Sequence, residues 1–180
     1  RQLRKLSITI YEPAFHIIGD PAKRDPRTRQ SADHSMVYII ATLLRKAIES
    51  QQAGWKEIML LPADYDDAAL VHPSTRELID KIEFRHGGAE YDAKYPDGIP
   101  TTLEIDHAEL GKLSSGLVMY PLGHARNSSR ELDDVLAFKF RSLAGLAVDD
   151  PEALRRRFSN LATKSAVEIA RIYDFPIRGV

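Results

Sequence analysis

The segment SADHSMVYIIATLLRKAIES, residues 31–50, carries the strongest structural signal in this chain. Its apolar residues recur at helical spacing and cover more than half of a helical circumference, so we expect a helix that is buried on most sides. The remaining strip of this helix holds His34, Tyr38, Thr42 and Arg45. Because residues four apart lie on one face of a helix, His34 and Tyr38 are predicted to be neighbours.

Short strands are predicted before and after this helix. Residues 6–10 and 101–107 alternate between apolar and polar side chains, and residues 113–120 are apolar and partly β-branched. The last two segments are predicted to pair as antiparallel neighbours through residues 108–112, and residues 82–85 offer a candidate fourth strand. The sequence therefore predicts an α+β fold, in which helices pack on a small, mainly antiparallel sheet.

Helix starts are predicted at several points by the residue types that cap helices. A Ser-x-x-Glu phrase has the form of a capping box, and Asp-Pro suits an N-cap followed by a first helical residue. The predicted starts are Pro73 with Ser74-x-x-Glu77, Ser128-x-x-Glu131, Asp150-Pro151 and Ser165-x-x-Glu168. Beyond residue 128 the apolar spacing is helical throughout. We therefore predict an α+β domain over residues 1–127 and an all-helical segment over residues 128–180, which docks on a helical body absent from these 180 residues.

The composition excludes several classes of function. The net charge of -1 provides no overall field that would gather DNA or RNA, and no run reaches the roughly 18 apolar residues of a membrane helix. The start lacks the basic-then-apolar layout of a signal peptide, so a cytoplasmic location is expected by default. Without cysteine, the chain offers no disulfide, thiol nucleophile or thiolate metal site.

The histidines show no pattern typical of a metal site. The chain has 6 of them, and none is spaced as H-x-H or H-x-x-x-H. A glycine-rich phosphate loop and a G-x-S-x-G nucleophile elbow are also missing from the sequence. We therefore expect no metal and no other cofactor.

Residues 120–127, YPLGHARN, end an apolar run with a turn that carries an imidazole and a guanidinium. Such a turn suits an anion, because arginine offers a planar fork to a carboxylate and glycine lets backbone amides approach. His124 and Arg126 are therefore candidate substrate-binding residues. A structural turn, in which His124 caps the next element, explains the same residues equally well.

His34 and Tyr38 are the candidate catalytic residues. An imidazole exchanges protons near neutral pH, and a phenol can donate a hydrogen bond to a developing charge. The alternative is purely structural: a histidine in the first helical turn, and an amphipathic tyrosine on the exposed strip of an otherwise buried helix.

These segments together resemble a known family. Asp33-His34-Ser35 with Tyr38 on an apolar helix, the helix and strand of residues 73–84, and Tyr-Pro-x-Gly-His-Ala-Arg ending at Arg126 occur in this order. Residues 1–145 are similar to the C-terminal half of the 2-methylcitrate dehydratase family, also called MmgE/PrpD. The resemblance implies an α+β lid, followed by a return into an all-helical body whose N-terminal portion is missing here. The chain also enters a strand abruptly, which agrees with a piece of a longer protein; a complete protein after trimming is the alternative.

The resemblance implies a metal-independent lyase of propionate catabolism that acts on a small polycarboxylate without a cofactor. The expected reaction is that of a hydro-lyase like 2-methylcitrate dehydratase, in which a proton is removed beside a carboxylate and water is lost. The family also includes a cis-aconitate decarboxylase and epimerase-like members, so these activities stay as alternatives. A homodimer is implied as well. Because the other active-site groups would belong to the missing portion, these 180 residues alone should be inactive.

The resemblance also implies roles for single residues. Tyr38 and His34 match positions of the lid helix that face the cleft, where they would orient the substrate or donate to it. His124 and Arg126 match the Gly-His-x-Arg turn, which would contact the anion or brace the lid against the body. Residues 54–67 are more elaborate than the short turn typical of the family. Since loops of this kind can set substrate discrimination, the identity of the acid stays open.

A non-catalytic α+β module that binds small organic acids is the alternative from a different class of protein. Such a module should be stable and responsive to ligand as these 180 residues alone. An enzyme fragment should instead expose an apolar face where the missing body docks. That face is expected along Leu132, Val135, Leu136, Phe140 and Phe158.

Overall fold

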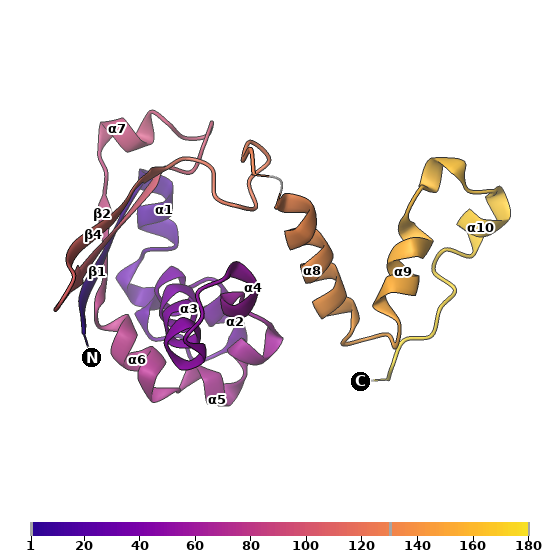
Figure 1. Ribbon diagram of the computed structural model, residues 1–180, viewed down its shortest axis with the longest axis horizontal. Coiled ribbons are helices and arrows are strands. Elements are labelled where there is room, and N and C mark those ends of the chain that lie inside the picture. Colours follow the sequence, from indigo (N-terminus) through magenta and orange to yellow (C-terminus); the bar gives the residue numbers. More distant parts are fainter. Residues whose placement is uncertain (1, 130, 180) are drawn as a thin grey trace. The chain divides into compact units, whose positions relative to one another are not determined.

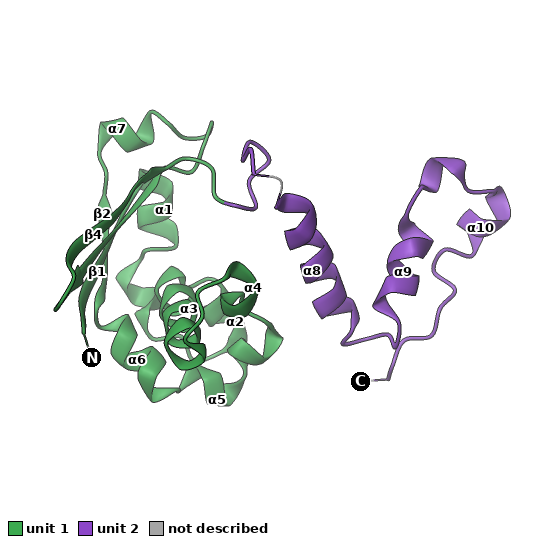
Figure 2. Cartoon of the chain, in the orientation of Figure 1, with its two compact units in different colours: residues 1–121 green, residues 122–180 purple. Residues whose placement is uncertain are grey.

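The computed structural model describes residues 2–129 and 131–179. The contacts of the chain divide it into two compact units, Arg1–Pro121 and Leu122–Val180 (Figure 2). This division falls a few residues before the boundary predicted after residue 127.

Unit 1 contains, within the described residues, a four-stranded mixed sheet in the order β2-β1-β3-β4. Strand β1 is parallel to β2 and antiparallel to β3, and β3 is antiparallel to β4. The strands are β1 (Leu3–Ile10), β2 (Ile82–His86), β3 (Thr101–His107) and β4 (Gly111–Val118). The predicted α+β class is confirmed, and so are the antiparallel pair near the end of the unit and the candidate strand after residue 82.

Helices of unit 1 cover one face of this sheet (Figure 1). Most of them lie in the long crossover between the parallel strands β1 and β2, where a parallel connection requires a dozen or more residues. They are α1 (Glu12–Ile17), α2 (Arg29–Asp33), α3 (Met36–Ser50), α4 (Trp55–Ile58), α5 (Asp67–Leu70) and α6 (Pro73–Ile79), with 3-10 turns η1 (Pro21–Arg24) and η2 (Pro62–Tyr65). The short helix α7 (Ala89–Asp92) follows β2.

The core of unit 1 lies between the sheet and its helices. Alternate residues of β1, namely Leu6, Ile8 and Ile10, are almost completely buried, as the period of a strand requires. From the other side, the core is filled by side chains of α3 and α6 such as Val37 and Leu78. Each such side chain stabilises the fold by roughly 1.5–3 kcal/mol when it leaves water.

The prediction that His34 and Tyr38 lie on one helical face was wrong. Helix α3 begins at Met36, and its N-cap is Ser35, whose hydroxyl accepts the N–H of Tyr38 at 3.2 Å. His34 precedes this cap and instead terminates the shorter helix α2. The chain turns between the two helices, because the Ser35 hydroxyl also donates to the Lys23 carbonyl at 2.7 Å and fixes the cap there.

The polar strip of α3 is buried rather than exposed, which corrects a second expectation. Tyr38 and Thr42 are 0% exposed, whereas Ile48, one of the apolar residues of the helix expected to be buried on most sides, is 61% exposed. The reason is that α6 packs against α3, and the hydroxyl of Tyr38 finds a carbonyl partner inside the fold. A buried polar group is tolerated when such a partner is present.

Two of the predicted capping boxes do not form. The N-cap of α6 is His72, and Pro73 occupies the first turn, where its missing N–H costs nothing. Helix α8 (Leu132–Ala144) has Glu131 as its N-cap without a side-chain hydrogen bond. Before it, the Asn127 side chain accepts the N–H of Ser129 at 2.7 Å, which holds the residues ahead of the helix in a turn.

Unit 2 is helical, as predicted. It contains α8, α9 (Pro151–Phe158), η3 (Leu161–Thr163) and α10 (Ala166–Ala170). Asp150 caps α9 and Ser165 forms a capping box with Glu168, so both of these predicted starts are confirmed. The tail of the chain packs back on α9, where the ring of Phe158 lies 5.6 Å from that of Tyr173.

None of the helices in residues 2–129 and 131–179 combines the length and the hydropathy needed to cross a membrane.

Candidate functional site

Asp33 is the last residue of α2, and His34 follows it in the exposed turn before α3. Helix α2 is short because it starts at the capping box of Thr28 and Ser31 and stops where Ser35 caps the next helix. The side chain of His34 is 69% exposed and that of Asp33 is 46% exposed. Both groups are therefore available to a ligand on the surface of unit 1.

The two side chains form a hydrogen-bonded pair. Nδ1 of His34 donates to the carboxylate of Asp33, and it lies 3.1 Å from the carbonyl oxygen of Gln30. Because both partners are acceptors, the proton sits on Nδ1, and Nε2 is the nitrogen that can bind another group. The hydrogen bond to Asp33, followed by that to Gln30, raises the pKa of His34 above its ordinary value. A larger share of the imidazole is therefore protonated near neutral pH.

Tyr38 is held inside the fold beneath this turn. Its hydroxyl donates to the carbonyl oxygen of Asp64 at 2.6 Å, and none of the residue is exposed. Burial is the main cause that raises the pKa of Tyr38. The hydroxyl of Tyr38 thus serves the contact between α3 and η2 in this chain, and a role toward the substrate stays a prediction.

The carboxylate of Asp64 is bound by cations of α3. Lys46 Nζ lies 2.6 Å from Oδ2 and Arg45 Nη2 lies 3.5 Å from Oδ1, and the three side chains are only 12–18% exposed. The N–H of Leu61 also donates to Oδ2 at 2.8 Å, and Lys46 donates to the carbonyl of Met59 at 2.8 Å. Helix α3 therefore contacts the segment around η2 through both a side chain, the Asp64 carboxylate, and a backbone group, the Met59 carbonyl.

Tyr65 is the residue of this region that the sequence reasoning missed. It directly follows Asp64, and its ring centroid lies 6.0 Å from that of Tyr38. The turn η2 packs against α2, which brings the half-buried phenol near Asp33. Burial raises the pKa of Tyr65 first, and the negative charge of Asp33 raises it further. The elaborate length of residues 54–67 was the one signal in the sequence that pointed to this segment.

His124 and Arg126 belong to unit 2, whereas His34 and Tyr38 belong to unit 1. Within the turn, Nδ1 of His124 accepts the N–H of Arg126 at 3.1 Å, and its carbonyl accepts the N–H of Asn127 at 2.9 Å. His124 therefore stabilises its own turn, whereas the structural interpretation expected it to cap the next element, and the N-cap of α8 is Glu131. That these two residues also bind a substrate carboxylate stays a prediction.

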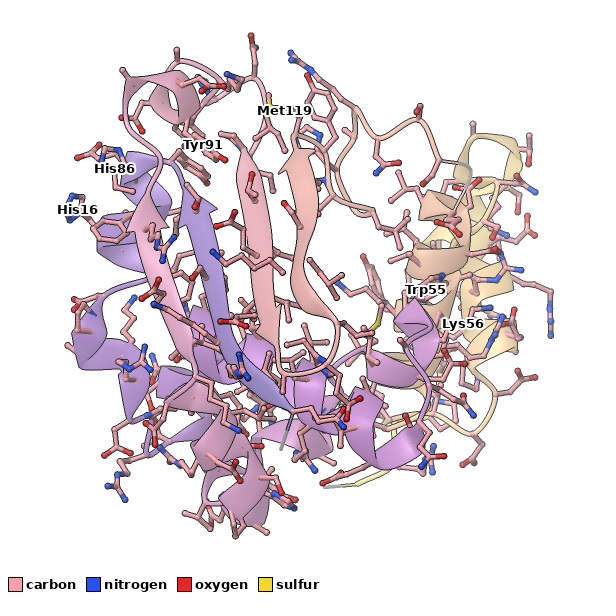
Figure 3. All side chains as sticks on the ribbon, turned by 60° about the vertical axis from the view of Figure 1, so that its left-hand side comes forward. His16, Trp55, Lys56, His86, Tyr91 and Met119 are labelled. Carbon is pink, nitrogen blue, oxygen red and sulfur yellow. The ribbon has the colours of Figure 1, made fainter. Side chains whose placement is uncertain are left out.

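A second histidine and carboxylate pair lies at the end of β2. His86 Nε2 is 2.9 Å from Asp92 Oδ2, and the N–H of Glu12 donates to Oδ1 at 2.8 Å. The hydrogen bond from Glu12, followed by the one from His86, lowers the pKa of Asp92. Figure 3 shows Tyr91 beside His86 at this end of the sheet, and the Tyr91 hydroxyl is 2.6 Å from that of Thr102. These contacts join α7 to α1 and to the sheet, which is a structural role.

The sheet face opposite the helices carries charges of both signs. A shallow hollow of about 260 Å³ is lined there by Lys5, Ser7, Arg85, Glu104, Ile105, Asp106 and Lys112. Glu83 lies beside it, and its hydrogen bond with Lys5 is the main cause that lowers its pKa to about 2. Since cations and anions alternate along this face and pair with one another, it does not favour an anionic ligand. In the described part of the chain, no cluster of three or more histidine and carboxylate side chains could hold a metal ion.

Two comparisons with known proteins bear on this site. The family model of the MmgE/PrpD C-terminal domain matches residues 1–164, a range that includes all four candidate residues. No match was found among curated proteins.

Proposed function

Since this chain belongs to the MmgE/PrpD family, as its C-terminal domain, we propose that it is the lid-bearing part of a lyase that acts on a small polycarboxylate. The reaction is removal of a proton beside a carboxylate with loss of water, as in 2-methylcitrate dehydratase, and it uses no metal. The observation that carries the proposal is the family match over residues 1–164. Because the family consists broadly of lyases and dehydratases, loss of water is the first reaction to test.

The exposed pair of Asp33 and His34 supports this chemistry. Loss of a hydroxyl group beside a carboxylate is assisted by an acid that protonates the leaving oxygen, and a positioned imidazolium can supply that proton. The hydrogen bond to Asp33 raises the pKa of His34 and fixes the proton of the neutral form on Nδ1. In this proposal, Nε2 of His34 faces the substrate, and Tyr38 orients the site from beneath.

His124 and Arg126 are proposed to hold a carboxylate of the substrate. A guanidinium binds a carboxylate through two parallel hydrogen bonds, and Arg126 is exposed. Within the turn, Nδ1 of His124 accepts the N–H of Arg126, which sets the direction of the imidazole in this proposal.

We further propose that unit 2 docks on a helical body, and that the complete enzyme is a cytoplasmic homodimer. Four large apolar side chains of unit 2 are each at least half exposed: Leu136, Leu143, Leu146 and Val167. Exposed apolar side chains that lie together are typical of a surface that binds another protein part. Of the residues expected on this face, Leu136 is exposed and Val135 is buried. Docking would remove the exposed side chains from water.

Turnover by the complete protein tests this function. The purified protein is incubated with 2-methylcitrate, citrate or cis-aconitate in the presence of EDTA, and the products are followed by proton NMR. We expect an unsaturated acid from one of the hydroxy acids at an undiminished rate in EDTA. Release of carbon dioxide from cis-aconitate, or inversion without loss of water, would identify a decarboxylase or an epimerase instead. Binding of an acid without any turnover would contradict the proposal and favour a binding module.

A further inference from the structure

We propose that Tyr65 supplies the phenol that contacts the substrate in this enzyme, and that Tyr38 acts as a positioning residue which anchors the turn carrying Tyr65. The inference rests on the proposed function, because it names a further residue of the same site. It departs from the sequence prediction, in which Tyr38 itself meets the substrate.

The hydroxyl of Tyr38 is fully buried and donates at 2.6 Å to the backbone carbonyl of Asp64. A phenol has one proton to donate, so this bond has to break before Tyr38 can donate to a substrate. Breaking it would leave a buried carbonyl without its partner, which is unfavourable. The hydrogen bond from Tyr38 to Asp64 therefore holds η2 against α3.

The turn η2 is held in place through Asp64. The Asp64 carboxylate is bound by Lys46 at 2.6 Å and by the N–H of Leu61 at 2.8 Å, with Arg45 at 3.5 Å. These contacts fix the residue next to Tyr65 from two sides, through its carboxylate and through its carbonyl. A side chain that must meet a substrate in a defined geometry needs a support of this kind.

The ring of Tyr65 packs near that of Tyr38, with centroids 6.0 Å apart and planes inclined by 41°. Among residues 2–129 and 131–179, the fold provides no hydrogen bond to the Tyr65 hydroxyl. Tyrosine in such a place presents an apolar body to the protein and a polar tip to a ligand. The fold positions this ring and leaves its hydroxyl available.

Charged groups of both signs lie near Tyr65. The carboxylate of Asp33, the partner of His34, and the guanidinium of Arg29 both interact electrostatically with its phenol. The Tyr65 hydroxyl is a hydrogen-bond donor at neutral pH, and burial and Asp33 raise its pKa further above that range. Together, a phenol donor, the imidazole of His34 and the cation of Arg29 suit the carboxylate of an organic acid. Of these groups, Tyr65 lies within residues 54–67, the loop expected from the sequence to set substrate discrimination, so its phenol also bears on which acid is selected.

Three tyrosine-to-phenylalanine variants of the complete protein test the inference, each removing one hydroxyl group. They are Tyr65→Phe, Tyr38→Phe and, as a matched control, Tyr91→Phe, whose hydroxyl contacts Thr102 at the end of the sheet. The probe is the acid that the wild-type protein converts in the turnover assay above. Each variant is measured for kcat, KM and melting temperature.

Tyr65→Phe should lower kcat/KM roughly 10- to 100-fold, the loss expected for one hydrogen bond to a charged ligand, at a wild-type melting temperature. Tyr38→Phe should lower the melting temperature and raise KM with a smaller change in kcat, because it loosens the support of Tyr65. Tyr91→Phe should affect the melting temperature alone. The inference is overturned if Tyr65→Phe keeps kcat/KM within about twofold of wild type, or if Tyr38→Phe loses more kcat than Tyr65→Phe at an unchanged melting temperature. An inactive wild-type protein would instead refute the proposed function itself.

Discussion

Asp33 sets the protonation of its neighbour His34. Because the pair is exposed, the fold contributes little by burial, and the hydrogen bond from Nδ1 to the carboxylate is the main cause of the raised pKa. A histidine whose pKa is raised on folding stabilises the folded state below its unfolded pKa. That contribution is lost as the pH rises through the folded pKa. The same interaction that tunes the imidazole therefore stabilises the turn mainly at mildly acidic pH.

Replacing the carboxylate should reverse this shift. In Asp33→Asn, we expect the pKa of His34 to fall toward the ordinary histidine value, since a neutral amide no longer favours the imidazolium. NMR titration of a His34 ring proton measures this pKa in the variant and in the wild-type protein. The same change at Asp106, on the opposite face of the sheet, serves as the control and should leave the His34 titration in place. An unchanged His34 pKa in Asp33→Asn would show that the Gln30 carbonyl alone accounts for the shift.

At the scale of elements, the contact between α3 and η2 depends on one carboxylate with little access to water. Removal of the Lys46 charge should leave the Asp64 carboxylate without its closest cation, in surroundings where the side chains are less than a fifth exposed. For Lys46→Met, we expect a loss of about 2–4 kcal/mol in the free energy of unfolding. Urea denaturation of the 180-residue chain measures this loss.

Lys94→Met is the matched control for that experiment. Lys94 pairs with Glu90 on the surface of α7, where the glutamate is 75% exposed, so its removal should cost less than about 1 kcal/mol. Equal losses in the two variants would mean that the Asp64 contacts do not hold η2 in place.

The strands were predictable from the sequence, while the surroundings of α3 were not. Alternation along β1 is a local pattern, because each second side chain must meet the core whatever lies beyond it. Burial of the polar strip of α3 instead depends on α6 and η2, which come later in the chain, so no window around Tyr38 contains that information. A single cap separated His34 from the helix of Tyr38, and element boundaries are the least predictable feature of a sequence.

In the candidate site, too, features set by neighbouring residues were predictable and features set by distant residues were not. The Asp33-His34 phrase was recognisable because its residues are adjacent, and the structure keeps them together in an exposed turn. Tyr65 was not recognisable, because its place near Asp33 arises only when η2 packs against α2. The turn of His124 and Arg126 was read from its glycine and histidine, and its internal hydrogen bonds agree with a tight turn.

At the scale of the whole molecule, the described core lies in unit 1, between its sheet and helices. Large apolar side chains are exposed in both units, and those of the shorter unit 2 include Leu136, Leu143, Leu146 and Val167. In the proposed enzyme, a helical body of the same protein covers those of unit 2. The 180-residue chain should then be less soluble than the complete protein, and inactive by itself.

A substitution on α8 tests this docking. Leu136 is 55% exposed, so Leu136→Lys should change the stability of the 180-residue chain by no more than about 0.5 kcal/mol. In the complete protein the same change should lower the melting temperature and the activity, since it would bury a charge in an apolar contact. Leu110→Lys in unit 1, where the leucine is 66% exposed, provides the control. An identical response of the complete protein to both substitutions would argue against docking at α8.

Proton removal beside a carboxylate is the central claim, and the fate of that hydrogen tests it most directly. The complete protein, treated with EDTA, is given 2-methylcitrate deuterated at the carbon that bears the methyl group, and deuterium release to water is followed by NMR. We predict that deuterium appears in water in step with the unsaturated product, and that His34→Gln slows both by roughly 100-fold or more, as expected for loss of a general acid. Product formation with the deuterium retained, or tight binding of the acid with no release at all, would contradict the account.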